Sequence, residues 1–315
     1  MLENDVNVYI MPIGSQDAVN HMYNTLLNKV DRTVISKFVQ IKDSLYENDK
    51  INVWGLVPGP QNERQWSRFR PGDIVIFVPS KYNLIVTKIL AKERNRDLAN
   101  TLWGEDKNGK TWELIFFVKI LNIIKKDKRS FLRELGYSEG DQLIGNRKIT
   151  DKFFSKYSSI DNFIDQHLED SISPEYLSDE IATQVVQNVL GRKSNRRKKY
   201  LERLKEEALK QNSRDYIEVK GKRIKRKAIF VAYVKERDGY KCRVCNFTFK
   251  KKDGENYVEV AHIIPLSEGG LDHPDNMVCL CPNCHKKLDL GDDDVRKEII
   301  DVLKSKGLNP WLQDR

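Results

Sequence analysis

The chain has 315 residues, of which 32% are charged and 9% aromatic, and its net charge is +9. This length predicts two or three domains with a real hydrophobic core, and the composition excludes a disordered chain. The charge is uneven: residues 191–227 hold 16 Lys or Arg against 5 Asp or Glu, an excess of 11, so the remaining residues sum to −2. Such a cationic stretch is typical of a protein that contacts phosphate, although a solvated helix face is the alternative.

Residues 1–128 are predicted to form a mixed domain rich in short strands. Ser15 can cap a first helix. Turns are expected at 70–73 and at Asn108-Gly109, next to strands predicted at 6–13, 51–57, 73–79, 83–90 and 112–124. Several short strands with one or two helices favour a small, strongly curved sheet or a barrel. The N-terminus has no basic region followed by an apolar run, and no stretch of 18 apolar residues occurs, so we expect a cytoplasmic protein without a membrane span.

Residues 129–215 are predicted to form a helical connector, because apolar residues recur there at helical spacing. Pro174 can open one of these helices, and Gly191 can end it. A very polar helix follows at about 195–212. Candidate contacts to a DNA backbone lie at the start of this helix and in the cationic stretch before the next one. They are Arg196, Arg197, Lys198, Lys199, Arg223 and Arg226. The alternative is that these side chains are simply solvated.

Residues 216–315 form the last predicted domain, and they contain all five cysteines, between 242 and 284. Paired C-x-x-C units in a chain without export features indicate a metal site rather than disulfides. Zinc binds four soft ligands in a tetrahedron, and each pair supplies two of them. Cys279 lies outside the pairs and is expected to be buried. The predicted ligands of a structural Zn²⁺ are Cys242, Cys245, Cys281 and Cys284.

The segment between the cysteine pairs resembles the HNH endonuclease family, also called ββα-metal nucleases. The motifs that carry the resemblance lie at 240–245, 260–267, 269–270, 275–276 and 280–285, and they span about fifty residues. The resemblance implies hydrolysis of a phosphodiester, with His262 as the base that activates water. It implies that Asn276 holds the loop bearing this base or helps at the metal. It also implies that His285 binds a divalent ion, Mg²⁺ or Mn²⁺, distinct from the zinc.

Two residues depart from the family pattern. Ala261 stands where many members have an Asp or His ligand, and Asp289 stands where many have a second His. Positions 285 and 289 share one helical face, so Asp289 can serve with His285. Glu259 lies on the same strand face as Ala261 and could reach the ion in its place, although a solvated strand residue is equally expected there.

The N-terminal domain resembles the PUA-like superfamily, nearest its EVE branch, over about a hundred residues. The resemblance rests on 53–57, on 62–66 and on 70–77. It implies a pocket for a modified base that is flipped out of the duplex, which needs flat apolar walls. Four of the five tryptophans lie in this domain. Trp54 and Trp103 are the candidates for the pocket because each precedes a glycine, and burial in the core is the alternative reading.

These expectations combine into an α+β multidomain protein, with a PUA-like β-barrel, a helical connector and a zinc-stapled HNH domain. The resemblance to modification-dependent restriction enzymes implies a DNA endonuclease that reads 5-methyl- or 5-hydroxymethylcytosine in double-stranded DNA. A homodimer would supply two HNH domains for paired cutting. The alternatives are an HNH restriction enzyme that reads an unmodified sequence, a non-catalytic DNA-binding protein, and a reader of RNA.

Overall fold

The computed structural model describes residues 6–80, 83–106, 108–141, 145–190, 195–210, 216–219, 222–251 and 254–308. The chain forms two compact units, Met1–Ser178 and Asp179–Arg315. The predicted connector at 129–215 has residues in both units, and the three-domain division stays a prediction. Among the helices of the described residues, none is long and apolar enough to cross a membrane.

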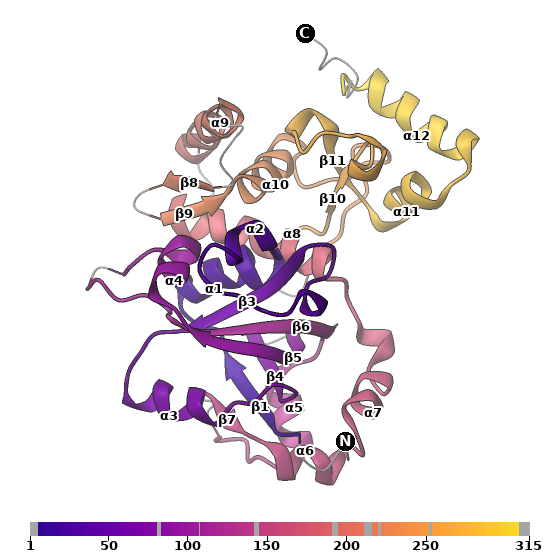
Figure 1. The fold of residues 1–315 in the computed structure, drawn as a ribbon. Helices are drawn as coiled ribbons and strands as arrows, with labels where there is room; N and C mark the ends of the chain where they lie inside the picture. The colour runs from indigo at the N-terminus through magenta and orange to yellow at the C-terminus, as the bar shows by residue number, and fades with distance from the viewer. Residues whose placement is uncertain are drawn as a thin grey trace. The chain divides into compact units, whose positions relative to one another are not determined.

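A seven-stranded sheet organises the first unit (Figure 1). Its strand order is β2-β3-β6-β5-β4-β1-β7. β1 pairs with β4 in parallel, and the other neighbours are antiparallel. The order ends at β2 and β7, which describes an open sheet rather than the expected closed barrel. The strands are β1 (Val8–Pro12), β2 (Val30–Asp31), β3 (Lys50–Leu56), β4 (Ile74–Ser80), β5 (Asn83–Arg94), β6 (Leu114–Ile124) and β7 (Arg147–Lys148).

Helices cover one face of this sheet near β3 and β6. α4 (Arg96–Trp103) buries Leu98 and Leu102 against Val53 and Phe117. Four shorter helical elements precede it in the chain: α1 (Gln16–His21), a π-helix (Met22–Leu27), α2 (Arg32–Ile35) and a 3-10 helix (Asp43–Leu45). Ser15 caps α1 as predicted, because its Oγ accepts a hydrogen bond from the backbone N–H of Ala18 at 3.1 Å.

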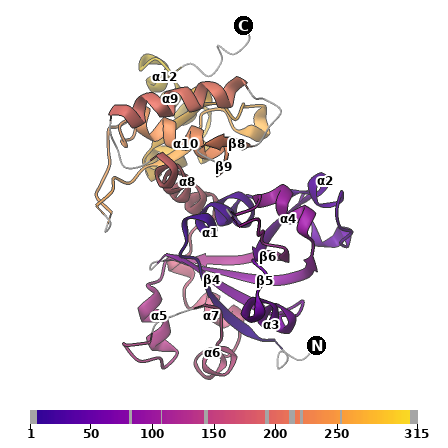
Figure 2. The same cartoon turned by 90° about the vertical axis from the view of Figure 1, so that its left-hand side faces the viewer.

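A second group of helices, which the sequence assigned to a connector, also packs on this sheet. α5 (Lys128–Glu134), α6 (Thr150–Lys156) and α7 (Ile160–Asp165) follow β6 in the chain (Figure 2). Phe131, Phe153 and Phe163 are fully buried in one cluster with Ile10 and Ile76 of the sheet. The apolar stripes of these helices therefore complete the core of the first unit. α3 (Pro60–Arg68) precedes β4.

The second unit contains a small antiparallel hairpin between helices. β10 (Glu259–His262) pairs with β11 (Met277–Leu280), so that His262 lies opposite Met277. α11 (Pro282–Leu290) and α12 (Asp293–Ser305) follow directly, and their buried residues share a core with this hairpin. The preceding elements are α8 (Pro174–Leu190), which begins in the first unit, α9 (Asn195–Lys210), β8 (Tyr216–Val219), β9 (Lys222–Lys225) and α10 (Arg226–Arg237).

Candidate functional site

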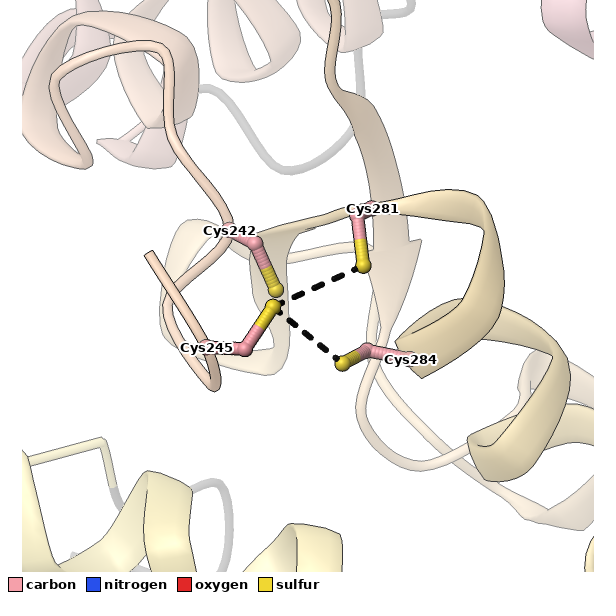
Figure 3. A group of neighbouring side chains, drawn as sticks. All are labelled: Cys242, Cys245, Cys281 and Cys284. Atoms are coloured by element: carbon pink, nitrogen blue, oxygen red, sulfur yellow. Dashed lines mark hydrogen bonds between the residues drawn. The ribbon is translucent and has the colours of Figure 1, made fainter. Parts of the chain in front are cut away.

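Four cysteine thiols meet at one point of the second unit (Figure 3). Their sulfur atoms all lie within 4.8 Å of one another, and Cys245 Sγ lies 3.7 Å from Cys281 Sγ and 3.8 Å from Cys284 Sγ. Cys242 and Cys245 follow α10, whereas Cys281 caps α11 and Cys284 lies in its first turn. Two C-x-x-C turns that face each other provide a tetrahedral set of thiolates, so this cluster can bind Zn²⁺.

The fifth cysteine takes no part in this cluster. Cys279 is fully buried in β11, its Sγ lies 3.8 Å from the carbonyl oxygen of Val234, and burial raises the pKa of its thiol. It is therefore a packed thiol, as predicted. In the described part of the chain, the other four are the only group of three or more His, Cys, Asp or Glu whose ligand atoms come within 4.8 Å of one another.

His262 ends β10, and its imidazole contacts a carboxylate. Its Nε2 lies 3.0 Å from Oδ1 of Asp272, in the loop that leads to β11. Burial tends to raise the pKa of Asp272, but the hydrogen bond to His262 and the charges of Lys227 and Arg226 hold this pKa below its usual value. Asp272 is absent from the expectations based on sequence. The only signal for it there is an acidic side chain between His262 and Asn276.

Asn276 is almost completely buried, at 1% exposure, and all its described side-chain hydrogen bonds go to the backbone of one loop. Its Nδ2 donates to the carbonyl oxygens of Ile264 and Leu271, both at 2.9 Å. Its Oδ1 accepts from the backbone N–H of Ile264 at 2.9 Å. These contacts join the two ends of the loop, and the role of Asn276 in the reaction stays a prediction.

Glu259, His285 and Asp289 lie together beside the hairpin. His285 Nδ1 is 2.6 Å from Glu259 Oε2, and His285 Nε2 is 3.3 Å from Asp289 Oδ2. The hydroxyl of Tyr257 donates to Glu259 Oε1 at 2.6 Å. Burial tends to raise the pKa of Glu259, but the hydrogen bonds from His285 and Tyr257 outweigh it and lower this pKa. Burial tends to lower the pKa of His285, but its two carboxylate neighbours raise it overall.

This group has the chemistry of a site for a divalent cation. One imidazole and two carboxylates suit Mg²⁺ or Mn²⁺. Both nitrogens of His285 contact carboxylates in this conformation, so one contact would open to present a lone pair to an ion. Ala261 is 3% exposed and packs in the core of the unit. On β10, Glu259 rather than Ala261 contacts His285.

The candidate DNA-backbone residues are placed differently from one another. The side chains of Arg196, Arg197 and Arg223 lie outside the described residues. Lys198 and Lys199 are exposed on α9. Arg226 is half-buried at the start of α10, with its guanidinium 5.4 Å from the ring centre of Phe230.

Trp54 and Trp103 are covered by the first unit, with 5% and 6% of their surfaces exposed. A Cβ on Gly55 would lie 2.7 Å from the Trp103 ring, so this glycine admits that ring rather than a ligand. Gly104 has a φ of +76° and follows the last residue of α4, where its N–H bonds the carbonyl of Asn100. Packing therefore explains the glycine at position 55, and the end of a helix explains the glycine at position 104. The assignment of Trp54 and Trp103 to a base pocket stays a prediction.

A cavity of about 940 Å³ lies elsewhere in this unit, beside β1 and β7. Neither Trp54 nor Trp103 lines it. Tyr9 and Phe69 contribute aromatic wall, with ring centres 4.4 Å apart. The charged side chains in its lining are mostly cationic: Arg68, Arg70, Arg147, Lys148 and Asp151.

Comparison with known proteins identifies a family model and two relatives that match parts of the chain. Residues 242–289 match the family model described as HNH endonuclease. A segment of 64 residues is 48% identical to the Type IV methyl-directed restriction enzyme EcoKMcrA of Escherichia coli K12, and it covers 20% of this chain and 22% of that relative. A segment of 59 residues is 41% identical to Anaredoxin of a Nostoc species, covering 19% of this chain and 70% of the relative. The chain thus spans about a fifth of the length of the E. coli relative.

One solved structure resembles half of the chain. The N-terminal domain of Thermococcus gammatolerans McrB bound to m5C DNA is 17% identical, with a TM-score of 0.38, and the match covers 50% of this chain and 99% of that one. This TM-score is too low to establish a shared fold.

Proposed function

We propose that the protein is a modification-dependent DNA endonuclease, because residues 242–289 match the HNH endonuclease family model. The observation that carries the nuclease part is the arrangement of His262, Asn276 and His285 around one hairpin, in the same unit as the four clustered cysteines. In this proposal the second unit hydrolyses phosphodiester bonds, and the first unit reads 5-methyl- or 5-hydroxymethylcytosine after the base flips out of the duplex.

The proposed reaction begins at His262. A neutral imidazole accepts the proton of a water molecule as the water oxygen attacks phosphorus. The new P–O bond forms, the bond to the 3′ oxygen breaks, and this oxygen leaves with the electron pair. His285, Glu259 and Asp289 would hold a Mg²⁺ or Mn²⁺ ion. Such an ion supplies charge stabilisation at the phosphate and the leaving oxygen. Asn276 keeps the loop next to the base in place.

The cysteine cluster has a separate role in this proposal. A Zn²⁺ on Cys242, Cys245, Cys281 and Cys284 would join the segment after α10 to the start of α11, which carries His285. Structural zinc stabilises a small domain because its ligands must be brought together for binding. In this proposal the four cysteines would hold the zinc, and the zinc would stabilise the position of α11, which carries His285.

The cavity of the first unit is the proposed entrance for the modified base. Its aromatic wall, Tyr9 and Phe69, suits a flat ring, and its excess of cations suits the flanking phosphates. The similarity to a methyl-directed restriction enzyme, although confined to 64 residues, supports a modified base as the target. A homodimer, with one nuclease unit for each strand, remains part of the proposal.

The test is cleavage of matched DNAs. One fragment is synthesised with cytosine, with 5-methylcytosine or with 5-hydroxymethylcytosine, and is incubated with the purified full chain and Mg²⁺ or Mn²⁺. We expect cleavage of a modified fragment, sparing of the cytosine fragment, and no cleavage by the His262→Ala variant. Equal cleavage of all fragments would overturn the proposal that cleavage depends on a modified cytosine. It would favour a nuclease that recognises an unmodified sequence. Binding without cleavage under any metal would favour a non-catalytic protein.

A further inference from the structure

His262 meets one carboxylate directly. Its Nε2 lies 3.0 Å from Asp272 Oδ1, and Nδ1 has no hydrogen-bond partner among the residues that the structure describes. A carboxylate with a lowered pKa is ionised near neutral pH, and an ionised carboxylate only accepts hydrogen bonds. The nitrogen that faces Asp272 therefore carries the proton. The lone pair of a neutral His262 is then on Nδ1.

The pair is held from both sides by Asn276. Its amide binds Leu271, the residue before Asp272, and Ile264, two residues after His262. The loop between them has little freedom, because a Cβ on Gly270 would lie 2.0 Å from the carbonyl oxygen of Ile264. Asn276 thus holds the backbone on both sides of the Asp272–His262 contact without touching either side chain.

A second acidic residue, Asp179, binds the backbone of β10 and not the imidazole of His262. Asp179 accepts a hydrogen bond from the backbone N–H of Val260, and its charge neighbours include Lys227, Lys235 and His262. Lys235 donates from Nζ to the backbone oxygen of Asp179 at 2.9 Å. Asp179 therefore binds the backbone of β10, and Asp272 is the carboxylate that orients the His262 ring.

We propose that Asp272 is a positioning residue that holds His262 with its proton on Nε2, so that Nδ1 takes the proton from the attacking water. Asp272 stays ionised throughout, and it also stabilises the imidazolium that forms when Nδ1 gains the proton. An acid that fixes the tautomer of a catalytic base in this way contributes a large factor to the rate without touching substrate. This inference rests on the proposed function, since it assumes that His262 is the base.

The first measurement does not depend on activity. The chain has five histidines, so ¹⁵N labelling of histidine gives few signals, and the His262→Ala variant assigns the one that matters. We expect the Nε2-protonated tautomer of His262 in the parent protein and a loss of this preference in Asp272→Asn and Asp272→Ala. A parent protein with the proton of neutral His262 on Nδ1 would overturn the proposal.

The second measurement is the rate of cleavage of bound DNA. Asp272→Asn is expected to lower kcat by roughly 10²–10⁴-fold while the KM for DNA changes by less than about threefold. Asp275→Asn is the matched control, because Asp275 lies in the same loop and its described side-chain contact is to His273, at 3.5 Å, and not to His262. This control makes the same change of charge and should keep the parental kcat.

The outcomes separate the two proposals. Cleavage by His262→Ala would overturn His262 as the base, whatever the NMR signals show. Loss of cleavage in His262→Ala together with parental kcat in Asp272→Asn would leave the proposed function intact and overturn the role of Asp272. An equal loss of kcat in Asp272→Asn and Asp275→Asn would also overturn it, because a general effect of loop charge would then explain the result.

Discussion

The side chain of Asn276 exchanges two hydrogen bonds with the backbone of Ile264, donating from Nδ2 to the carbonyl oxygen and accepting at Oδ1 from the N–H, each at 2.9 Å. We therefore predict that Asn276→Ala destabilises the second unit by about 2–4 kcal/mol, because it removes a buried side chain and leaves three backbone groups of the loop without their partners. Urea unfolding followed by a signal from this unit measures the loss. Cleavage should fall with it, since His262 is next to the released loop.

Asn256→Ala is the matched control for this prediction. Asn256 makes a single long side-chain hydrogen bond, from Nδ2 to the carbonyl oxygen of Tyr240 at 3.4 Å. Its replacement should cost less than about 1 kcal/mol. Equal stability losses for the two variants would contradict the special role of Asn276 in closing the loop.

Gly270 supports the same loop through its lack of a side chain. A Cβ there would lie 2.0 Å from the carbonyl oxygen of Ile264 and 2.8 Å from Nδ2 of Asn276, and backbone cannot yield as a flexible side chain can. We predict that Gly270→Ala lowers both the free energy of unfolding, by about 1–3 kcal/mol, and the rate of DNA cleavage. Gly140→Ala, at a site with no heavy atom within 4 Å, should change neither quantity measurably.

The cysteine cluster predicts a zinc content of about one ion per chain. Cys245→Ser replaces a thiolate with a poor zinc ligand, so zinc content should fall and the thermal midpoint of the second unit should drop. Elemental analysis and calorimetry of the purified proteins measure these two effects. Cys279→Ala is the control that also removes a thiol: it costs core packing, but the zinc content should stay at the parental value because Cys279 lies outside the cluster. Zinc loss in both variants would argue against the assigned ligands.

Local features of this protein follow from its sequence because they depend on near neighbours. The Ser15 cap and the helix that opens at Pro174 were predicted, and strands were expected where β1, β3, β4, β5 and β6 form. The cysteine cluster was also predictable, since two C-x-x-C turns need only to face each other. In each case a residue type and a short spacing limit the conformation strongly.

Features that depend on which surfaces meet were not predictable. Helical spacing shows that Phe131 and Phe163 each lie on the apolar stripe of a helix, but it does not show that these stripes pack on the sheet of the first unit. Likewise, a glycine after Trp54 signals a close approach without naming what approaches, and the structure places Trp103 there. The contact between Asp272 and His262 depends on how the loop folds back, which residue spacing does not encode.

The cationic lining of the cavity in the first unit predicts a specific loss of DNA affinity. Arg68→Ala should weaken binding of DNA that carries the modified base by roughly 3–10-fold, and it should lower the slope of log Kd against log salt by about 1, because one phosphate contact is lost. Arg64→Ala is the control, since Arg64 lies one turn earlier on α3, is equally exposed and does not line the cavity. Fluorescence anisotropy over a series of salt concentrations compares the two. Similar losses in both variants would count against the cavity as the site that meets DNA.

The hydrogen bonds of Glu134 predict that the free energy of unfolding of the first unit depends on pH. Its carboxylate accepts hydrogen bonds from Lys126 Nζ and from the hydroxyl of Tyr157, both at 2.8 Å. Burial tends to raise the pKa of Glu134, but these two donors lower it overall. A carboxyl whose pKa is lower in the folded state stabilises the fold above its unfolded pKa of about 4.3, and this contribution disappears as the pH falls through the folded pKa.

Tyr157→Phe tests this dependence, because the ring is kept and only the donor is lost. At pH 7 we expect the free energy of unfolding to fall by about 1 kcal/mol, since the partly exposed carboxylate regains water in place of the hydroxyl. Near pH 3 the difference from the parent protein should shrink, because Glu134 becomes protonated in both proteins. Chemical denaturation at the two pH values, with Tyr137→Phe as a control outside this hydrogen bond, measures the change. A difference that stays constant or grows on acidification would show that the hydroxyl of Tyr157 does not stabilise the ionised form of Glu134.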